Sequence, residues 1–458
     1  VIRRPMFSQS APTAPSRPAS RRTAPAGDAK AAHPHDARWL VPVLIGVLAA
    51  VAILLRWCAR SQLYYGWDVV QYALGIERFD LADHRPHPPG CFYYVILGRF
   101  LTLFTPDPHT SLLVISATCG GLLVGVAWHL AREWGGEAAG TWAALMAAFA
   151  PFFCFYGAVG LPYAVEGVIA PLVALAAWRL ARGDRSWGTA LGLGLAYGLA
   201  IGFRPTVLPF LLPIWIVGMR PLVRHEPARA AVSLAALLLL TLGWFVPTVI
   251  SAGGLANYLE LNAAMTHMFR SSAVWAHGWD PAWIAYALRR AGMTHATTLL
   301  TGVAPGLALL VLVIPFVGGR AWPLVPRGVL RFAILWTLPA FLFYLLAHFN
   351  SPGYALTYMA GLACVVAVAL ARCFALLPWG ATALGQVALT ATMVWCFWVG
   401  IPGMPPERWD QLTLTRAEIS HHDHYFQRFR DYVRSRFAPG EVIVIAGTTS
   451  SNGLRTLQ

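Results

Sequence analysis

The chain has 458 residues, of which 57% are hydrophobic and only 12% are charged. Soluble globular proteins carry roughly twice that charged fraction, so a protein of one or two soluble domains is excluded. The apolar content also excludes a disordered protein. The formal net charge of +14 comes from arginine, since Lys30 is the only lysine. The arginines lie in short loops between apolar runs, which is typical of polytopic membrane proteins and argues against a nucleic-acid partner.

The amino-terminal residues 1–38 are rich in Ala, Pro, Ser and Arg, with no acid before Asp28. This composition predicts a disordered basic tail that stays in the cytoplasm. The apolar run 39–58 that follows is long enough to cross the membrane once. The seven cysteines form no CxxC pair, and most lie in or beside apolar runs. They are therefore predicted to be small buried residues without disulfides.

Ten further apolar runs, together with 39–58, predict an all-α polytopic membrane protein with about 11 transmembrane helices. The ten runs are 110–130, 138–155, 162–180, 187–203, 205–219, 229–250, 297–317, 329–348, 354–376 and 380–402. Residues 91–105 are left out because at 1.5 Å per residue they span only about 22 Å of a ~30 Å hydrocarbon core. They also carry Arg99 near their middle, so they are predicted to form an interfacial or re-entrant helix.

The arginines decide between this topology and one in which 91–105 crosses the membrane. With 91–105 outside, eleven loop arginines lie on the cytoplasmic side: Arg132, Arg179, Arg182, Arg185, Arg220, Arg224, Arg229, Arg320, Arg327, Arg331 and Arg372. Only four lie outside: Arg204, Arg270, Arg289 and Arg290. A crossing at 91–105 would exchange these counts, so the positive-inside rule favours the first topology. It predicts a plasma (inner) membrane protein with a cytoplasmic amino terminus and an outside carboxyl-terminal tail.

Three outside segments are large or polar, namely 59–109, 251–296 and 403–458. The last begins with a helical pattern at 421–437 and continues as a buried strand at 441–446. One helix and one strand cannot bury a core by themselves, so the tail is expected to be a small, truncated α/β domain. The predicted domains are thus the tail 1–38, the transmembrane domain 39–402 and the outside tail 403–458.

The first outside loop contains a helical pattern directly after the first span. Apolar side chains recur on one face, which predicts an amphipathic helix on the membrane surface. The apolar face is Val69, Tyr72, Ala73, Ile76 and Phe79, and the opposite face is Gln71, Gly75 and Arg78. Asp68 lies in the first turn, where the helix dipole favours a carboxylate. Asp68 is therefore either a functional carboxylate or an anchor of the helix.

The loop continues with the sequence His84-Arg-Pro-His-Pro-Pro-Gly90. Each proline fixes φ and moves the preceding residue away from helix, so an extended turn is predicted to lead into the short helix. Its polar residues, which are expected to support the first loop, are Asp80, Asp83, His84 and His87. They are either ordinary solvated groups or ligands of a divalent metal, since no spacing among them is diagnostic.

This layout resembles the GT-C superfamily of membrane glycosyltransferases. The shared features are a first span, an early Asp on a surface helix, and a Pro-Pro motif that opens a second short helix, all within residues 64–95. The closest similarity is to family 39 relatives, which include protein mannosyltransferases and the aminoarabinose transferases of lipid A. Supporting stretches are 155–166, 202–206 and 350–354. Many family members have Asp-Glu where this chain has Asp68-Val69, so the second carboxylate of the family is missing at that position.

The resemblance implies transfer of a sugar from a polyprenyl-phosphate carrier on the outer face, with Asp68 as the catalytic carboxylate. Such a transfer needs a base on the acceptor hydroxyl, opposite the leaving phosphate. A single carboxylate without a covalent intermediate inverts the anomeric carbon. The partners implied are the lipid-phosphate sugar, membrane lipids and an acceptor that is a protein, a lipid or a glycan.

Two charged residues at the outer ends of spans extend the candidate site. Glu166, at the outer end of the 162–180 span, is a candidate catalytic residue, since a carboxylate at membrane depth is costly. It could orient Asp68, bind the acceptor or hold a metal, or it is an exposed residue just above the headgroups. Arg204 lies between two apolar runs with almost no polar neighbours in sequence. Its planar fork suits a lipid phosphate, although an arginine can also extend to anionic headgroups.

Further candidates lie in later parts of the chain. His348 and Asn350 lie at the outer end of the 329–348 run and could bind the phosphate or the sugar. The 251–296 loop carries histidines and tryptophans that suit a sugar or a membrane interface. The cluster His421-His422-Asp423-His424 is interpreted as a solvated helix start. No cofactor is certain, and a divalent metal stays open. A lipid or polysaccharide transporter is the alternative function, and a non-catalytic scaffold is another.

Overall fold

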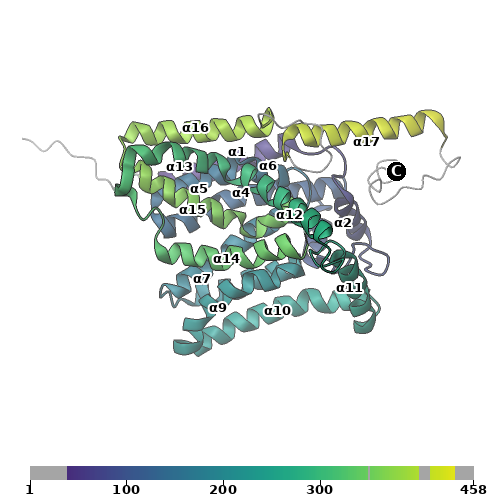
Figure 1. The fold of residues 1–458 in the computed structure, drawn as a ribbon. Helices are drawn as coiled ribbons and strands as arrows, with labels where there is room; N and C mark the ends of the chain where they lie inside the picture. The colour runs from purple at the N-terminus through teal and green to yellow at the C-terminus, as the bar shows by residue number, and fades with distance from the viewer. Residues whose placement is uncertain (1–38, 349–350, 402–412, 439–458) are drawn as a thin grey trace, which may run out of the picture. The chain divides into compact units, whose positions relative to one another are not determined.

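The computed structural model describes residues 39–348, 351–401 and 413–438 (Figure 1). The predictions of a disordered tail at 1–38 and a strand at 441–446 lie outside these residues. By their contacts, residues 1–41 and 42–458 form two separate units. The helix packing that positions the site lies within the second unit.

Nine helical stretches among the described residues are long and apolar enough to cross a membrane. They are α1 (Leu40–Ala59), α4 (Pro108–Gly135), α7 (Tyr163–Ala181), η1 with α9 (Pro205–Val207 and Leu208–His225), α10 (Pro227–Ser251), α13 with η2 (Ala304–Val317 and Gly318–Ala321), α14 (Arg327–Leu346), η3 with α15 (Pro352–Ala355 and Leu356–Phe374) and α16 (Trp379–Trp398). The prediction of an all-α polytopic membrane protein is confirmed. The one β element described is an isolated antiparallel bridge between Asp80 and Arg85.

The other two predicted spans are shorter helices. Residues 138–155 form α5 (Glu137–Phe149) and α6 (Pro151–Tyr156), because Pro151 has no N–H and ends the helix before it. Residues 187–203 form α8 (Trp187–Phe203), which has 17 residues. The remaining helices are α2 (Trp67–Glu77), α3 (Phe92–Leu101), α11 (Leu255–Arg270), α12 (Pro281–Gly302) and α17 (Arg416–Arg436). The length of α3, 10 residues, agrees with a segment too short to span.

The helices differ greatly in how far they are enclosed. In α15, 89% of the apolar window is buried inside the protein, whereas only 11% is buried in α1. Helix α15 packs against α4, α5, α7, α13 and α14. Small residues along these helices let the backbones approach closely, as in other membrane bundles. Helix α15 is thus central, and the apolar face of α1 is left for lipid.

The surface helix α2 is buried on more sides than an amphipathic pattern predicts. Its expected apolar face is buried, but Gln71 and Gly75 on the opposite face are buried too. The chain folds back over them, so that a Cβ added at Gly75 would lie 2.9 Å from Cδ of Pro86. The face opposite the apolar stripe is thus covered by the protein at Gln71 and Gly75 and exposed at Arg78.

Arg99 joins α3 to the end of α2. Its Nε donates to the carbonyl oxygen of Ile76 at 2.7 Å, and its Nη2 donates to that of Gly75 at 3.0 Å. These carbonyls have no partner within α2, because a helix leaves its last four carbonyls unpaired. The arginine in the middle of the short apolar run thus caps the neighbouring helix.

The tail helix α17 is bound to the segment 62–65, which precedes α2 and has no regular secondary structure. Asp423 accepts hydrogen bonds from the backbone N–H groups of Gln62 at 2.8 Å and Leu63 at 3.2 Å. Glu418 accepts one from the hydroxyl of Tyr65 at 2.9 Å. Asp423 is only 3% exposed, so the interpretation of this segment as a solvated helix start is wrong. The contact brings the tail to the loop that carries Asp68.

Candidate functional site

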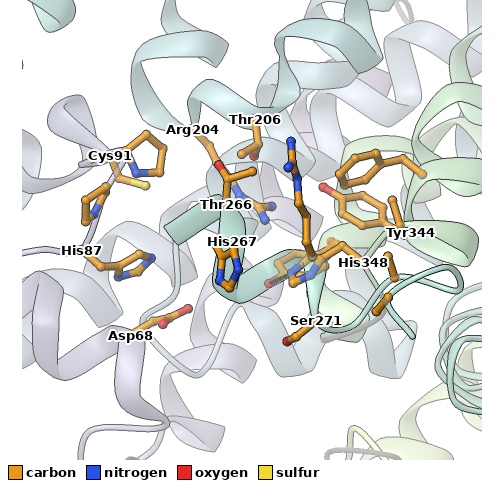
Figure 2. A pocket seen from close by; sticks show the side chains of 18 of the residues that line it. Asp68, His87, Cys91, Arg204, Thr206, Thr266, His267, Ser271, Tyr344 and His348 are labelled. Carbon is orange, nitrogen blue, oxygen red and sulfur yellow. Dashed lines mark hydrogen bonds between the residues drawn. The ribbon is translucent and has the colours of Figure 1, made fainter. Parts of the chain in front are cut away.

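A cavity of about 920 Å³ lies where the first loop meets α11, α14 and η3 (Figure 2). Its polar lining comes from Asp68, Tyr72, His87, Cys91, Tyr163, Arg204, Thr206, Thr266, His267, Arg270, Ser271, His277, Tyr344, His348 and Tyr354. In Figure 2, Asp68 and His87 lie on one side and Tyr344 and His348 on the other, with Arg204 between them. Segments far apart in sequence thus build one site, with a volume suited to a small-molecule ligand.

Asp68 lies in the first turn of α2, after Gly66 with a φ of +82°. Glycine adopts this conformation without the strain that a Cβ would bring, so the chain can turn sharply into the helix. The half-buried carboxylate of Asp68 has no hydrogen bond or ion pair with a described residue. It also does not cap its own helix, whereas Asp107 of α4 accepts from the backbone N–H of Thr110 at 2.9 Å. Asp68 is therefore available to a ligand in the cavity.

His87 is placed next to Asp68 by three contacts. Its ring stacks on Trp67, with centroids 5.6 Å apart and an angle of 17° between planes. Its backbone N and its Nδ1 both contact Oε1 of Gln71, at 3.0 and 2.5 Å. Burial lowers the pKa of His87, and the nearby Asp68 carboxylate opposes that effect. The ring is thus neutral at neutral pH.

Cys91 is the one cysteine that lines the cavity. Its Sγ lies 3.4 Å from the hydroxyl of Tyr72. Burial raises the pKa of the Cys91 thiol to about 11. A thiol with so high a pKa is a poor nucleophile at neutral pH, so covalent thiol chemistry is not favoured here.

Arg204 forms a buried ion pair with Glu166. Nη1 of Arg204 donates to Oε1 of Glu166 at 2.7 Å, and the hydroxyl of Thr357 donates to Oε2 at 2.9 Å. The side chains of Arg204 and Glu166 are 11% and 2% exposed. The guanidinium carbon lies 4.9 Å from the ring centre of Tyr163 and 4.5 Å from that of Tyr354, distances typical of cation–π contacts. Arg204 thus has polar neighbours that its sequence environment does not show.

The far side of the cavity is formed by His348 and its partners. The Nε2 atom of His348 lies 3.3 Å from the hydroxyl of Tyr354, and its Nδ1 lies 3.1 Å from Oγ of Ser272. At the rim, Arg270 has no carboxylate partner among the described residues. Asn350, the other residue predicted here, lies outside the described residues.

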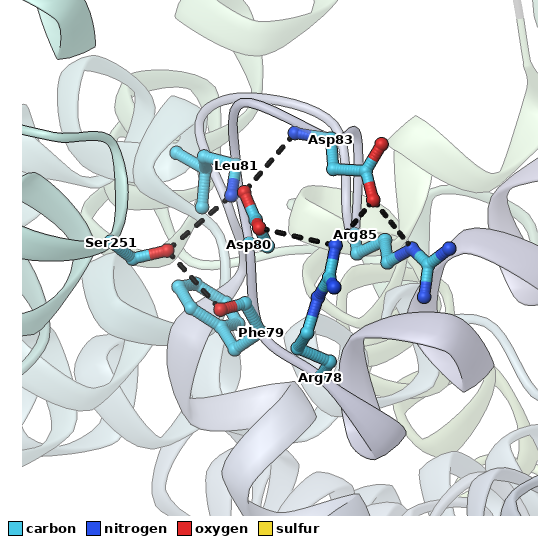
Figure 3. A network of polar contacts seen from close by, with 7 residues as sticks. All are labelled: Arg78, Phe79, Asp80, Leu81, Asp83, Arg85 and Ser251. Carbon is cyan, nitrogen blue, oxygen red and sulfur yellow. Dashed lines mark hydrogen bonds and ion pairs between the residues drawn. The ribbon is translucent and has the colours of Figure 1, made fainter.

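Of the four predicted support residues of the first loop, only His87 lines the cavity. Asp80 and Asp83 belong to a network with Arg78 and Arg85 (Figure 3). The N–H of Leu81 donates to Oγ of Ser251, which ties this loop to the end of α10. His84 is exposed, with a φ of +53°. These acids thus brace the loop.

The described residues contain no preformed metal site. They contain no group of three or more His, Cys, Asp or Glu side chains placed to hold an ion. The prediction of buried cysteines holds for Cys91, Cys154, Cys364 and Cys373, whereas Cys58 is exposed and Cys119 and Cys396 are half-buried.

Sequence reasoning missed the residues that orient the charged groups. Gln71 and Thr357 carry no motif, and their importance comes only from contacts across the fold. The tyrosines that enclose Arg204 had a partial signal, since Tyr163 and Tyr354 follow Pro162 and Pro352 at the starts of two spans. Aromatic residues at such positions also mark a membrane interface, so the signal was ambiguous.

Comparisons with known proteins agree with this architecture. Residues 86–251 match the family model of dolichyl-phosphate-mannose-protein mannosyltransferase. The structure of ArnT from Cupriavidus metallidurans bound to undecaprenyl phosphate is similar with a TM-score of 0.59 and 15% identity, over 92% of this chain and 85% of that one. The chain therefore shares the fold of this ArnT structure. The apo structure of the same ArnT gives a TM-score of 0.54 at 14% identity, over 91% and 85% of the two chains. Comparison with curated protein sequences gives no match.

Proposed function

We propose that this protein transfers a sugar from a polyprenyl-phosphate carrier to an acceptor hydroxyl at the outer face of the plasma membrane. One observation carries the proposal: a single cavity holds the unpartnered carboxylate of Asp68 together with the guanidinium groups of Arg204 and Arg270. Sugar transfer from a lipid phosphate requires a base for the acceptor hydroxyl and cations for the leaving phosphate, and this cavity contains both. The fold shared with ArnT and the family-model match support the same chemistry.

Asp68 acts as the base. It takes the proton of the acceptor hydroxyl while the acceptor oxygen bonds to the anomeric carbon. The bond between that carbon and the phosphate oxygen breaks, and its electron pair leaves with the phosphate. Attack from the side opposite the phosphate inverts the anomeric carbon. The transition state is oxocarbenium-like, as in glycoside hydrolysis.

Arg204 binds the phosphate of the carrier. Only one of its N–H groups is bonded to Glu166, which leaves further donors in a planar fork for phosphate oxygens. Glu166 holds the guanidinium in place and balances its charge while no ligand is bound. Glu166 is therefore a positioning residue for Arg204 and does not act as the base, because both of its oxygens already accept hydrogen bonds. His348 and Arg270 complete the phosphate side.

The membrane orientation follows from the arginine distribution. The cavity lies beside the first loop, and α17 contacts that same loop, so both belong to one face of the membrane. We place this face outside and the amino terminus in the cytoplasm. Single cysteines introduced at Arg85 and Arg430, without the native cysteines, should label from outside, and those at Gly183 and Val325 from inside. Labelling of position 430 from inside would overturn the orientation.

The function is tested with purified protein in lipid, polyprenyl-phosphate sugars of several kinds, and a panel of protein, lipid and glycan acceptors. Release of free polyprenyl phosphate that depends on an acceptor and on Asp68 is the expected result. Carrier movement across the bilayer without cleavage would instead support a transporter. Equal sugar transfer by wild type and Asp68→Asn would remove the proposed base.

A further inference from the structure

Gln71 fixes the proton arrangement of His87. The backbone N–H of His87 lies 3.0 Å from Oε1 of Gln71, and a backbone N–H can only donate a hydrogen bond. The side-chain amide atom at this position must therefore be the carbonyl oxygen, which settles the orientation of the amide. Gln71 is 6% exposed and cannot exchange this contact easily for water.

The same oxygen determines the tautomer of the His87 ring. Nδ1 lies 2.5 Å from Oε1 of Gln71. Since this oxygen can only accept, Nδ1 carries the proton, and the neutral ring keeps its lone pair on Nε2. Nε2 has no hydrogen-bond partner among the described residues, and His87 lines the cavity.

The surroundings of His87 keep the ring in this state. Trp67 stacks on it, and the tight contact between Gly75 and Pro86 holds the chain that precedes it. The charged and titratable groups that face the ring are Asp68, Tyr72, His84 and Arg204. Burial, His84 and Arg204 lower the pKa of His87, and only Asp68 raises it.

We propose that His87 binds a hydroxyl group of the donor sugar or of the acceptor through Nε2, beside Asp68, and does not bind the carrier phosphate. This inference rests on the proposed function. A hydroxyl can donate to a lone pair, whereas the phosphate of a sugar phosphodiester is an anion without a proton to donate. The lone pair of a neutral imidazole repels such an oxygen. His87 and Asp68 thus form the hydroxyl side of the cavity, and Arg204 forms the phosphate side.

The first experiment measures binding of polyprenyl phosphate, without a sugar, to wild type, His87→Ala and Arg204→Ala. We expect His87→Ala to keep the wild-type Kd within about twofold, while Arg204→Ala loses about tenfold or more, since a charged hydrogen bond is lost. Equal weakening by both variants would overturn the proposal, because His87 would then be a phosphate ligand. Thermal unfolding of each variant checks that it is folded.

The second experiment identifies the source of the hydroxyl. In steady-state transfer, an increase of KM for the acceptor in His87→Ala assigns the hydroxyl to the acceptor, and an increase for the donor sugar assigns it to the donor. Unchanged kinetics for both would overturn the proposal. If wild type binds the carrier but transfers no sugar, the proposed function fails by itself, and the carrier-binding result still tests His87.

The third experiment uses Gln71→Glu as a matched variant. A glutamate can accept the same two hydrogen bonds, but its charge favours the imidazolium form, in which Nε2–H is a donor. The pKa of His87 should rise, so the acid limb of the kcat/KM profile should move to higher pH. The ¹⁵N resonances of labelled histidine, assigned with His87→Gln, should show a proton on Nδ1 in wild type and on both nitrogens in Gln71→Glu. A wild-type proton on Nε2 would contradict the tautomer.

Discussion

Two buried arginines, Arg56 and Arg204, show how the same side chain serves different parts of this protein. Arg56 of α1 is fully buried and donates to main-chain carbonyls, among them Ala147 at 2.8 Å and Ala148 at 3.1 Å. In a continuous helix the carbonyl of Ala147 would accept from residue 151, but Pro151 has no N–H. Arg56 thus replaces the hydrogen bond that the proline removes.

Arg56 has no space for a ligand. A Cβ added at Gly120 would lie 2.1 Å from its Nε, so the helix can pass the guanidinium only with glycine at this position. Further N–H groups are bonded to Ala52 and Phe153. Arg204, in contrast, has one bonded carboxylate and an open side toward the cavity. Burial of an arginine in a membrane protein therefore does not by itself mark a functional site, whereas unused N–H donors that face a cavity do.

The sharpest test of the cavity side is Asp68→Asn. Because the basic oxygen is lost while the size is kept, we expect turnover to fall by roughly 10²–10⁴-fold, the range typical of a general base. Thermal stability should hardly change, since Asp68 caps no helix. The measurement is single-turnover transfer with saturating donor.

Asp107→Ala is the matched control for that substitution. Asp107 also begins a helix, but its side chain caps α4. The Asp107→Ala variant should lose about 1 kcal/mol in its free energy of unfolding and keep the wild-type turnover per folded molecule. If Asp68→Asn instead behaves like Asp107→Ala, Asp68 is only a helix anchor.

Arg204→Lys should have the next largest effect. The charge remains, but the fork that can grip two phosphate oxygens is lost, so kcat/KM for the donor should fall about tenfold or more. KM for the acceptor should change less. Glu166→Gln should also lower kcat/KM for the donor, because the Arg204 guanidinium loses its ionic partner. An Arg204→Ala variant with wild-type donor kinetics would show that this arginine has no role at the phosphate.

Arg56→Met should separate stability from activity. The substitution fills similar space but leaves buried carbonyls without donors, each of which costs about 1–3 kcal/mol. We expect a large drop in Tm, measured by thermal unfolding in detergent, with unchanged KM values in the fraction that stays folded. A raised donor KM at unchanged Tm would place Arg56, and not Arg204, in the role of ligand-binding arginine.

The contrast also shows what the sequence could predict. Apolar runs located nine of the eleven predicted spans as long helical stretches of the described chain, because membrane helices must satisfy their own backbone. The run 138–155 failed as a single helix because Pro151 divides it into α5 and α6. Asp68, His87, Arg204 and His348, which the sequence nominated separately, all line the one cavity. Their chemical type was visible because polar groups are rare in such a chain.

The hydrogen-bond and ion-pair partners of these side chains could not be predicted from the sequence. Glu166 and Arg204 are 38 residues apart, and Asp423 is about 360 residues from the backbone that it binds. No periodicity or spacing encodes such contacts, since they follow from how helices pack. Arg56 was likewise hidden at the end of an apolar run, where an arginine usually extends to the headgroups.

The smallest effect is expected for Asp83→Asn. The side chains of Asp83 and Arg78 are 51% and 60% exposed, so their ion pair at 2.6 Å is largely screened by water. Exposed pairs contribute about 0–1 kcal/mol, so Tm and donor KM should stay close to wild type. A double-mutant cycle of Asp83→Asn with Arg78→Gln measures the coupling directly. If Asp83→Asn lost as much turnover as Asp68→Asn, the loop acids would take part in ligand or metal binding. Asp80 and Asp83 would then belong to the functional site and not only to the network that braces the loop.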